Sequence, residues 1–407
     1  MSLMKLSRAL LDDIANKAAE YSPRKNVGGW IGSCKLLTRV ARPLVYKEIG
    51  YVVRKRAPPL QRLDRFFGST AFKEACAHVQ HLHIFAGAIS PMGGKFAHIA
   101  IPIADIAQSC KNFPRLLKVT IEGVDVVGWG IHDQPSPVTS VRTLQFRDVV
   151  VGEEGLGVVF ALKWLPNLDT LILDVVPRPF FQILLPDQSS IHSLYVSCSP
   201  LDAGIAEPVS YACRRTLTDL EIAITRSCHH DVSEWEASLP QLNQLHQLEA
   251  LTVRITISED LTELEDMRDL QRQCQWILSR AEMVGVVQQK VRIVLDDYSP
   301  YRSGIVWTAI NPAITIIFDQ TTAHALAQPD CSVIFELQQP EDFPQDDPWA
   351  EGCERLIRES EGEIPPNLEI RIVRMADEYA KFRIARPSGP FSADDWDEDE
   401  GFRSFSE

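Results

Sequence analysis

The sequence predicts an α/β protein in which a short helical N-terminal module precedes a solenoid of stacked strand-and-helix units. Three observations predict this class. A six-residue apolar pattern recurs along the middle of the chain, helix-compatible segments lie between its copies, and residues 6–49 show helical spacing. The chain has 407 residues, of which 45% are hydrophobic and 24% charged, as is typical of a folded protein with a large core.

The recurring pattern is an apolar residue, two variable residues, a second apolar residue, one variable residue and a third apolar residue. Its seven copies begin at Val79, Leu116, Val141, Leu168, Ile191, Leu217 and Leu248, and their central apolar residues are Leu82, Val119, Leu144, Leu171, Leu194, Leu220 and Leu251. Successive central residues are 23 to 37 positions apart. Most of these gaps lie in or near the period of about 20–29 residues that leucine-rich repeats have.

The physical reason for the pattern is a short strand that buries one face, since its last two apolar positions alternate with variable ones. Helix-compatible return segments precede several copies, at 103–111, 156–164, 208–214 and 232–242. Such units cannot bury their cores alone, so they stack into a curved solenoid with a parallel sheet on the concave face and helices on the convex face. Because no consistent Asn or Cys follows the strands, the repeats are irregular, and an ordinary α/β domain is the alternative.

The variable residue between the last two apolar positions of each copy is expected to lie on the concave face. These residues are the predicted target-binding positions: His83, Thr120, Gln145, Ile172, Tyr195, Glu221 and Thr252. Strand alternation alone supports this set, and solvent-facing side chains without a partner are the simpler interpretation.

The N-terminal module, assigned to residues 1–55, contains two helical patterns. Leu6, Leu10, Leu11 and Ile14 mark a short amphipathic helix, and Cys34, Leu37, Val40, Ala41 and Leu44 follow the same spacing of three and four. A turn-rich loop at 22–29 separates the two. Pro43 is expected to end or kink the second helix because it lacks a backbone donor.

Three stretches of this module resemble a degenerate F-box, of the kind that fungal families place ahead of leucine-rich repeats. They are LSRALLDDI at 6–14, SCKLL at 33–37 and ARPLVYKEI at 41–49, of which the last is the best match. Ser7 stands where the family has Pro, Ala9 replaces the usual Glu, and the second helix lacks its Trp, although Trp30 lies just before it.

The resemblance implies a substrate-receptor subunit of a cullin-RING (SCF-type) ubiquitin ligase. In that family the N-terminal helices bind a Skp-type adaptor and the repeats hold a protein target. By position, the resemblance assigns adaptor binding to Leu6, Leu10, Leu11, Ile14, Leu37, Pro43, Leu44 and Tyr46. Such a subunit acts by binding, without catalytic residues or a cofactor. The alternative is a leucine-rich-repeat scaffold with no role in ubiquitin transfer, whose N-terminal helices only cap the solenoid.

After the repeats of residues 56–260, residues 261–387 are expected to hold a capping helix and either an α/β segment or divergent repeats. Residues 261–289 have helical spacing. Short apolar runs at 291–295, 305–310, 314–318, 333–337 and 368–373 read as strands, and 349–359 as a helix. Residues 388–407 form an acidic tail that is expected to be disordered.

Charge and cysteine usage bound the partners and the compartment. A formal net charge of −14 disfavours general binding to nucleic acid or to an anionic membrane. The nine cysteines are scattered singly, which is typical of reduced thiols. No run reaches the roughly 18 apolar residues that span a bilayer, so the sequence predicts a cytoplasmic or nuclear protein.

The sequence offers few groups for catalysis. His78, His81 and His83 flank a predicted strand, where His81 and His83 would share the exposed face, and His229 and His230 precede Asp231. Neither group has the spacing of a metal site. Asp296 and Asp297 read as a turn. Besides the ligase subunit and the scaffold, a third hypothesis is an enzyme whose site assembles from loops at the strand ends. This hypothesis requires a deep pocket with converging titratable groups.

Overall fold

A computed structural model describes the chain over residues 11, 14–16, 35–53, 75–86, 100–127, 136–147, 149, 164–174, 190–198, 213–224, 245–257, 272, 274–275, 278, 286–295, 303–339 and 364–374. The described helices are α3 (Lys35–Val45), α6 (Ile103–Cys110) and α10 (Ser303–Ala327). The strands are β1 (Glu48–Val53), β2 (His81–Ala86), β3 (Ala100–Pro102), β4 (Lys118–Glu122), β5 (Asp125–Val127), β6 (Thr143–Arg147), β7 (Thr170–Asp174), β8 (Ser193–Cys198), β9 (Asp219–Ile224), β10 (Ala250–Ile257), β11 (Gln288–Leu295), β12 (Ser332–Gln339) and β13 (Leu368–Arg374).

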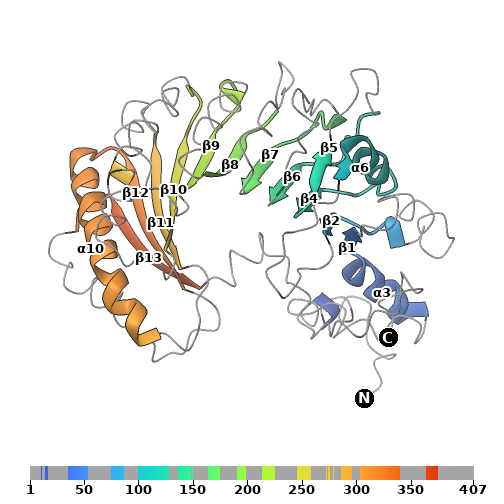
Figure 1. Cartoon of the computed structure of the whole chain (residues 1–407), viewed down its shortest axis with the longest axis horizontal. Coiled ribbons are helices and arrows are strands. Elements are labelled where there is room, and N and C mark those ends of the chain that lie inside the picture. Colours follow the sequence, from blue (N-terminus) through green and yellow to red (C-terminus); the bar gives the residue numbers. More distant parts are fainter. Residues whose placement is uncertain are drawn as a thin grey trace.

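Eleven of these strands form one open parallel sheet in the order β1-β2-β4-β6-β7-β8-β9-β10-β11-β12-β13, while β3 and β5 form a separate parallel pair. Figure 1 shows the large sheet curving into an arch, with α6 and α10 on its outer side. Neighbouring strands follow each other in sequence, as in a solenoid, and each returns to the same end of the sheet through a crossover. The predicted α/β class and parallel sheet are therefore confirmed.

The strand register aligns the central apolar residues of the recurring pattern in a single row across the sheet. Leu82 pairs with Val119, Val119 with Leu144, and so on through Leu171, Leu194, Leu220 and Leu251. All seven side chains are buried. A shift of one residue in any strand would turn its apolar set toward the opposite face, so this buried row fixes the register.

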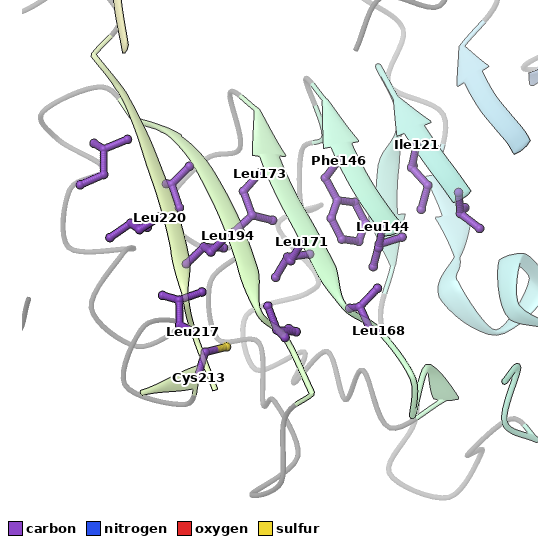
Figure 2. Close-up of a cluster of buried hydrophobic side chains, with 14 of the residues drawn as sticks. Ile121, Leu144, Phe146, Leu168, Leu171, Leu173, Leu194, Cys213, Leu217 and Leu220 are labelled. Carbon is purple, nitrogen blue, oxygen red and sulfur yellow. The ribbon is translucent and has the colours of Figure 1, made fainter. Parts of the chain in front are cut away.

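The core lies between the sheet and the outer helices. Figure 2 shows leucines and Phe146 from successive strands stacked into one continuous apolar layer. Ile106 and Ala107 of α6 join this layer at one end, and Phe318 of α10 meets Phe335 of β12 edge to face, with ring centroids 5.1 Å apart. Each unit thus buries its apolar face against its neighbours and not within itself.

Polar side chains tie the turns that precede the strands to one another. Asn167 Nδ2 donates to the Thr139 carbonyl at 2.8 Å, Ser190 Oγ to Leu168 at 2.7 Å, and Thr216 Oγ1 to Ile191 at 2.8 Å. Each donor directly precedes the first apolar residue of its pattern. These bonds satisfy backbone carbonyls that the turns would otherwise leave without a donor.

The structure corrects the prediction for residues 305–310 and 314–318, which are not strands but parts of the single helix α10. Its buried residues Ile314, Ile317, Phe318, Thr321 and Ala325 are three or four positions apart or adjacent, which is helical spacing. The two short apolar runs were ambiguous because a buried helix and a buried strand look alike over so few residues.

The sheet extends beyond the seven predicted units at both ends. β1 lies inside the range 1–55 assigned to the helical module, and β11, β12 and β13 continue the parallel order through 261–387. Gln289 occupies the row position that Leu251 holds in β10, and it is buried against His324 of α10. Residues 291–295, 333–337 and 368–373 are strands as predicted, and α6 (Ile103–Cys110) forms within the predicted segment 103–111. Residues 272, 274–275 and 278 of the predicted 261–289 helix are helical, but its end is not, because Gln288 and Gln289 belong to β11.

Several predicted segments lie outside the described residues. They are most of 156–164, 208–214 and 261–289, the predicted helices at 232–242 and 349–359, and the acidic tail at 388–407.

We predict that Phe146→Ala lowers the free energy of unfolding by about 3–5 kcal/mol, because the ring is fully buried and its loss leaves a cavity. Urea denaturation followed by circular dichroism measures the change. The control is Leu117→Ala. Because Leu117 is 46% exposed, this substitution should change the free energy of unfolding by less than about 1 kcal/mol. Equal losses in the two variants would contradict the assignment of Phe146 to the core.

Candidate functional site

The face of the sheet opposite the core is a polar surface on the inner side of the arch (Figure 1). The predicted target-binding residues form one row across it. His83 pairs laterally with Thr120, followed by Gln145, Ile172, Tyr195, Glu221 and Thr252. Lys290, Ile334 and Glu369 continue the same row. Strand alternation therefore correctly predicted that these seven residues, which come from seven different strands, lie in one row on the same face of the sheet.

Accessibility changes along this row. His83, Thr120, Gln145 and Ile172 are buried, with Thr120 and Gln145 each only 1% exposed. Tyr195, Glu221, Thr252 and Lys290 are half-buried. The accessible residues of the row are thus on β8 to β11 and at Glu369 on β13, and the residues on β2 to β7 are buried.

The first half of the face carries a connected set of polar side chains, here called the histidine cluster: Glu48, His81, His83, Thr120, Glu122, Gln145 and Arg147. His81 Nε2 lies 3.0 Å from Thr120 Oγ1, and that hydroxyl donates to Gln145 Oε1 at 3.3 Å. His83 Nε2 lies 2.9 Å from Glu122 Oε2, which Arg147 Nη1 approaches to 3.8 Å. The cluster satisfies its buried polar atoms internally, as buried polar groups require.

Burial decides the protonation of this cluster. Burial is the largest cause that lowers the pKa of His81, and the charges of Lys118 and His83 lower it further. Glu48, 3.6 Å from Nδ1, raises the pKa of His81. Burial likewise lowers the pKa of Lys118 to about 8, helped by Arg147 and opposed by Glu48. The contact of His81 Nδ1 with the Glu48 carboxylate, at 3.6 Å, is the main cause that lowers the pKa of Glu48. At neutral pH the structure therefore favours a neutral His81.

The second half of the face carries the arginine cluster: Tyr195, Glu221, Arg254, Lys290, Arg292 and Glu336. Arg292 Nε donates to Glu336 Oε1 at 2.6 Å, and Lys290 Nζ to Glu336 Oε2 at 3.2 Å. Glu221 Oε1 is 3.3 Å from Arg292 Nη1 and 3.7 Å from Arg254 Nη1. Arg254 also stacks over the Tyr195 ring and donates to its hydroxyl at 3.3 Å.

Two like charges lie side by side in this cluster. Arg254 and Arg292 are lateral partners in neighbouring strands, and both are nearly buried. Glu221 bridges them, and Glu336, itself 2% exposed, neutralises Arg292 and Lys290. Burial alone would raise the pKa of Glu336, but the charges of Arg292 and Lys290 and their hydrogen bonds outweigh it and lower that pKa. Such a network holds each long side chain in one orientation.

The N-terminal helices form a small separate core of Ala15, Val40 and Ala41, against which Leu44 and Val45 pack. Of the predicted adaptor-binding residues, Leu11 and Leu37 are buried, Ile14, Leu44 and Tyr46 half-buried, and Pro43 exposed, whereas Leu6 and Leu10 lie outside the described residues. Pro43 lies inside α3, which ends two residues later. Among the predicted adaptor-binding residues, the exposed Pro43 and the half-buried Leu44 and Tyr46 therefore lie together around the C-terminal end of α3, while Ile14 keeps a half-buried side chain earlier in the module.

A shallow hollow of about 380 Å³ lies at the N-terminal ends of β12 and β13, where Asp330, Cys331 and Glu369 are among the residues that line it. Burial raises the pKa of Cys331, which keeps this thiol protonated and a poor nucleophile. Within the described ranges no group of three His, Cys, Asp or Glu residues could hold a metal ion. His229, His230, Asp231, Asp296 and Asp297 lie outside those ranges.

Sequence reasoning missed Arg254 and Arg292. Arg254 lies two residues beyond Thr252 of the predicted row, so the same alternation places it on the same face. Arg292 is on β11, which the recurring pattern does not reach, and the structure places it beside Arg254.

A comparison with protein-family models finds no match for this chain, and no curated protein matches it significantly. Of the helices that the structure describes, none has the length and apolar character needed to cross a membrane.

We predict that acidification from about pH 7.5 to about pH 5.5 destabilises the native chain more than a His81→Gln variant. The folded state holds the pKa of His81 below its usual value, so the unfolded chain binds the proton more readily as the pH falls through about 6.5. Urea midpoints across this pH range measure the difference. An identical pH dependence in both chains would contradict this role of His81.

We predict that Glu336→Ala lowers the free energy of unfolding by about 3–5 kcal/mol, because it leaves Arg292 and Lys290 without their shared buried carboxylate. Chemical denaturation measures the loss. Glu369→Ala is the control on the neighbouring strand, since it removes an exposed ion pair with Arg371 and should change stability little. If Glu336→Ala were as stable as this control, the network would not stabilise the sheet.

Proposed function

We propose that this chain is a substrate-receptor subunit of a cullin-RING ubiquitin ligase, with its N-terminal helices on a Skp-type adaptor and a protein target on the inner face of the sheet. The observation that carries the proposal is the single lateral row of Tyr195, Glu221, Thr252 and Lys290 on an open parallel sheet. The F-box-like and leucine-rich sequence patterns supply the link to ubiquitin transfer.

The dimensions of the row favour a protein target over a small molecule. Parallel strands lie about 4.8 Å apart, so the four accessible positions from Tyr195 to Lys290 span roughly 14 Å of an open sheet face. An α-helix is about 10–12 Å in diameter, so this stretch is wide enough to seat one helix of a protein target. Small-molecule sites are enclosed cavities lined by converging groups, unlike this extended surface.

The arginine cluster gives the accessible half of the row its chemistry. Tyr195 offers an aromatic ring and a hydroxyl, and Arg254 holds that ring by stacking and by a hydrogen bond. Tyrosine and arginine are the residue types that most often dominate binding energy at protein interfaces. Because Tyr195 and Arg254 are already held in place, this chain loses less side-chain conformational entropy when a target binds here.

The adaptor surface, in this proposal, is centred on Pro43 and Tyr46. Both lie at the end of α3 and keep accessible side-chain surface, whereas Leu11 and Leu37 are buried within the chain. In this arrangement the buried residues shape the module, and the accessible pair contacts the adaptor.

We predict that the native chain co-purifies with a Skp-type adaptor as a one-to-one complex and that Pro43→Glu/Tyr46→Glu abolishes it. Two carboxylates buried without partners at the adaptor contact would destabilise the complex by far more free energy than the contact contributes to binding. The measurement is size-exclusion chromatography with light scattering on co-expressed proteins. Arg39→Glu is the matched control, because it makes the same change in net charge at an exposed position of α3 and should retain the complex. Tyr195→Ala, in the target row, should also retain it.

A second candidate function is a repeat scaffold with no part in ubiquitin transfer. The burial of Leu11 and Leu37 favours it, since these residues already pack within the chain as those of a simple cap would. Absence of any adaptor complex with the native, folded chain would overturn the ligase proposal and leave the scaffold.

A further inference from the structure

The last strand of the sheet, β13, pairs with β12 on one side, and no described strand lies on its other side. The Val333 N–H donates to the Asn367 carbonyl at 2.9 Å, so the backbone groups of residue 367 face β12. Successive residues of a strand direct their backbone groups to opposite sides. The N–H and C=O groups of Ile370 and Ile372 and the C=O group of Leu368 therefore face the open edge, while the Leu368 N–H donates to the Pro365 carbonyl at 3.0 Å.

The side chains of this edge alternate between apolar and charged. Leu368, Ile370 and Ile372 lie on the core side of the sheet, and Ile372 is 38% exposed although it is a large apolar residue. Glu369 and Arg371 lie on the polar side, where Arg371 Nε and Nη2 donate to the two Glu369 carboxylate oxygens, both at 2.7 Å. Charges on an edge strand normally block pairing with other strands. A partner strand must therefore match them.

We propose that two copies of this chain pair antiparallel through β13, with the two-fold axis at Ile370, and so join their sheets into one. This register sets Ile370 opposite Ile370 and Leu368 opposite Ile372 of the second copy. It also sets Glu369 opposite Arg371 at both ends of the contact. The outward backbone groups then form about four hydrogen bonds between the two copies, two between the Ile370 residues and two from Ile372 N–H to the Leu368 carbonyl of the other copy.

The alternative registers are excluded by the same side chains. In a continuous sheet, a residue on the core side of one strand must lie opposite a residue on the core side of the next. The two-fold axis can therefore pass only through a residue of β13 and not between two residues. A two-fold axis at Glu369 sets two glutamates directly opposite each other, and one at Arg371 sets two arginines opposite each other. Like charges opposite each other destabilise a strand pair, and opposite charges stabilise it. Only the axis at Ile370 makes the edge complementary to itself.

This surface is independent of the proposed ligase function, because β13 and α3 lie at opposite ends of the arch (Figure 1). A dimer joined there leaves the Pro43 and Tyr46 surface and the target row uncovered. Its formation or failure therefore says nothing for or against adaptor binding.

The test uses the full chain in sedimentation velocity over a concentration series, with two charge-reversal variants. Glu369→Arg makes the edge wholly basic, and Arg371→Glu makes it wholly acidic. Each variant alone should raise the dimer dissociation constant at least about tenfold, because two attractive pairs become repulsive. An equimolar mixture of the two variants should restore dimers, since each edge then meets its opposite charge. Asp319→Arg, an exposed change of the same charge on α10, should dimerise like the native chain.

Three results would overturn the proposal: a native chain that stays monomeric throughout the series, single variants that dimerise as well as the native chain, or a mixture that stays monomeric. Thermal unfolding by circular dichroism checks that each variant is folded. The mixture separates pairing from a structural role, because damage to the fold of either variant cannot be repaired by adding the other.

Discussion

The in-register stacking of buried apolar residues at the centre of each strand is the constraint on which the rest of this protein depends. Leu82, Val119, Leu144 and their successors lie in one row because each needs its neighbours to exclude water from its own side chain. Since a strand has a period of two, fixing this row also fixes which residues face the inside of the arch. The polar face is thus a consequence of the apolar one.

The polar face is organised as two networks and not as a uniform surface. In the histidine cluster, neutral donors and acceptors join neighbouring strands through His81, Thr120 and Gln145. In the arginine cluster, two carboxylates hold three cations. Buried networks of this kind are intolerant of single changes, because each member satisfies another. The surface left for a partner is therefore small, rigid and centred near Tyr195.

Much of the fold could be predicted because its signal is local and repeated. The seven apolar motifs are visible in the sequence, and alternation within each of them gives the face of every variable residue. The eighth unit was hidden because β11 carries Gln289 at the row position, where the pattern requires an apolar residue. The burial of Gln289 is made possible by a hydrogen bond to His324, which lies 35 residues further along the chain. Sequence reasoning also missed the polar residues that link successive turns, Asn167, Ser190 and Thr216. They precede the strands, and their residue type varies from one unit to the next. Neither the pairing of Arg292 with Glu336 nor the contact of Glu221 with two arginines has a local signature, since each joins different units.

The side chain of Asn367 bears on how the end of the sheet comes apart. Its Nδ2 lies 2.9 Å from each of the carbonyls of Ala325, Gln328 and Cys331, at the end of α10 and in the turn before β12. In a stacked array each unit is stabilised mainly by its neighbours, so the terminal unit is the one expected to fray. Here a single amide joins the start of the last strand to the end of the preceding helix. Opening β13 would remove the amide that these three carbonyls share, so helix and strand should be lost together in one cooperative step.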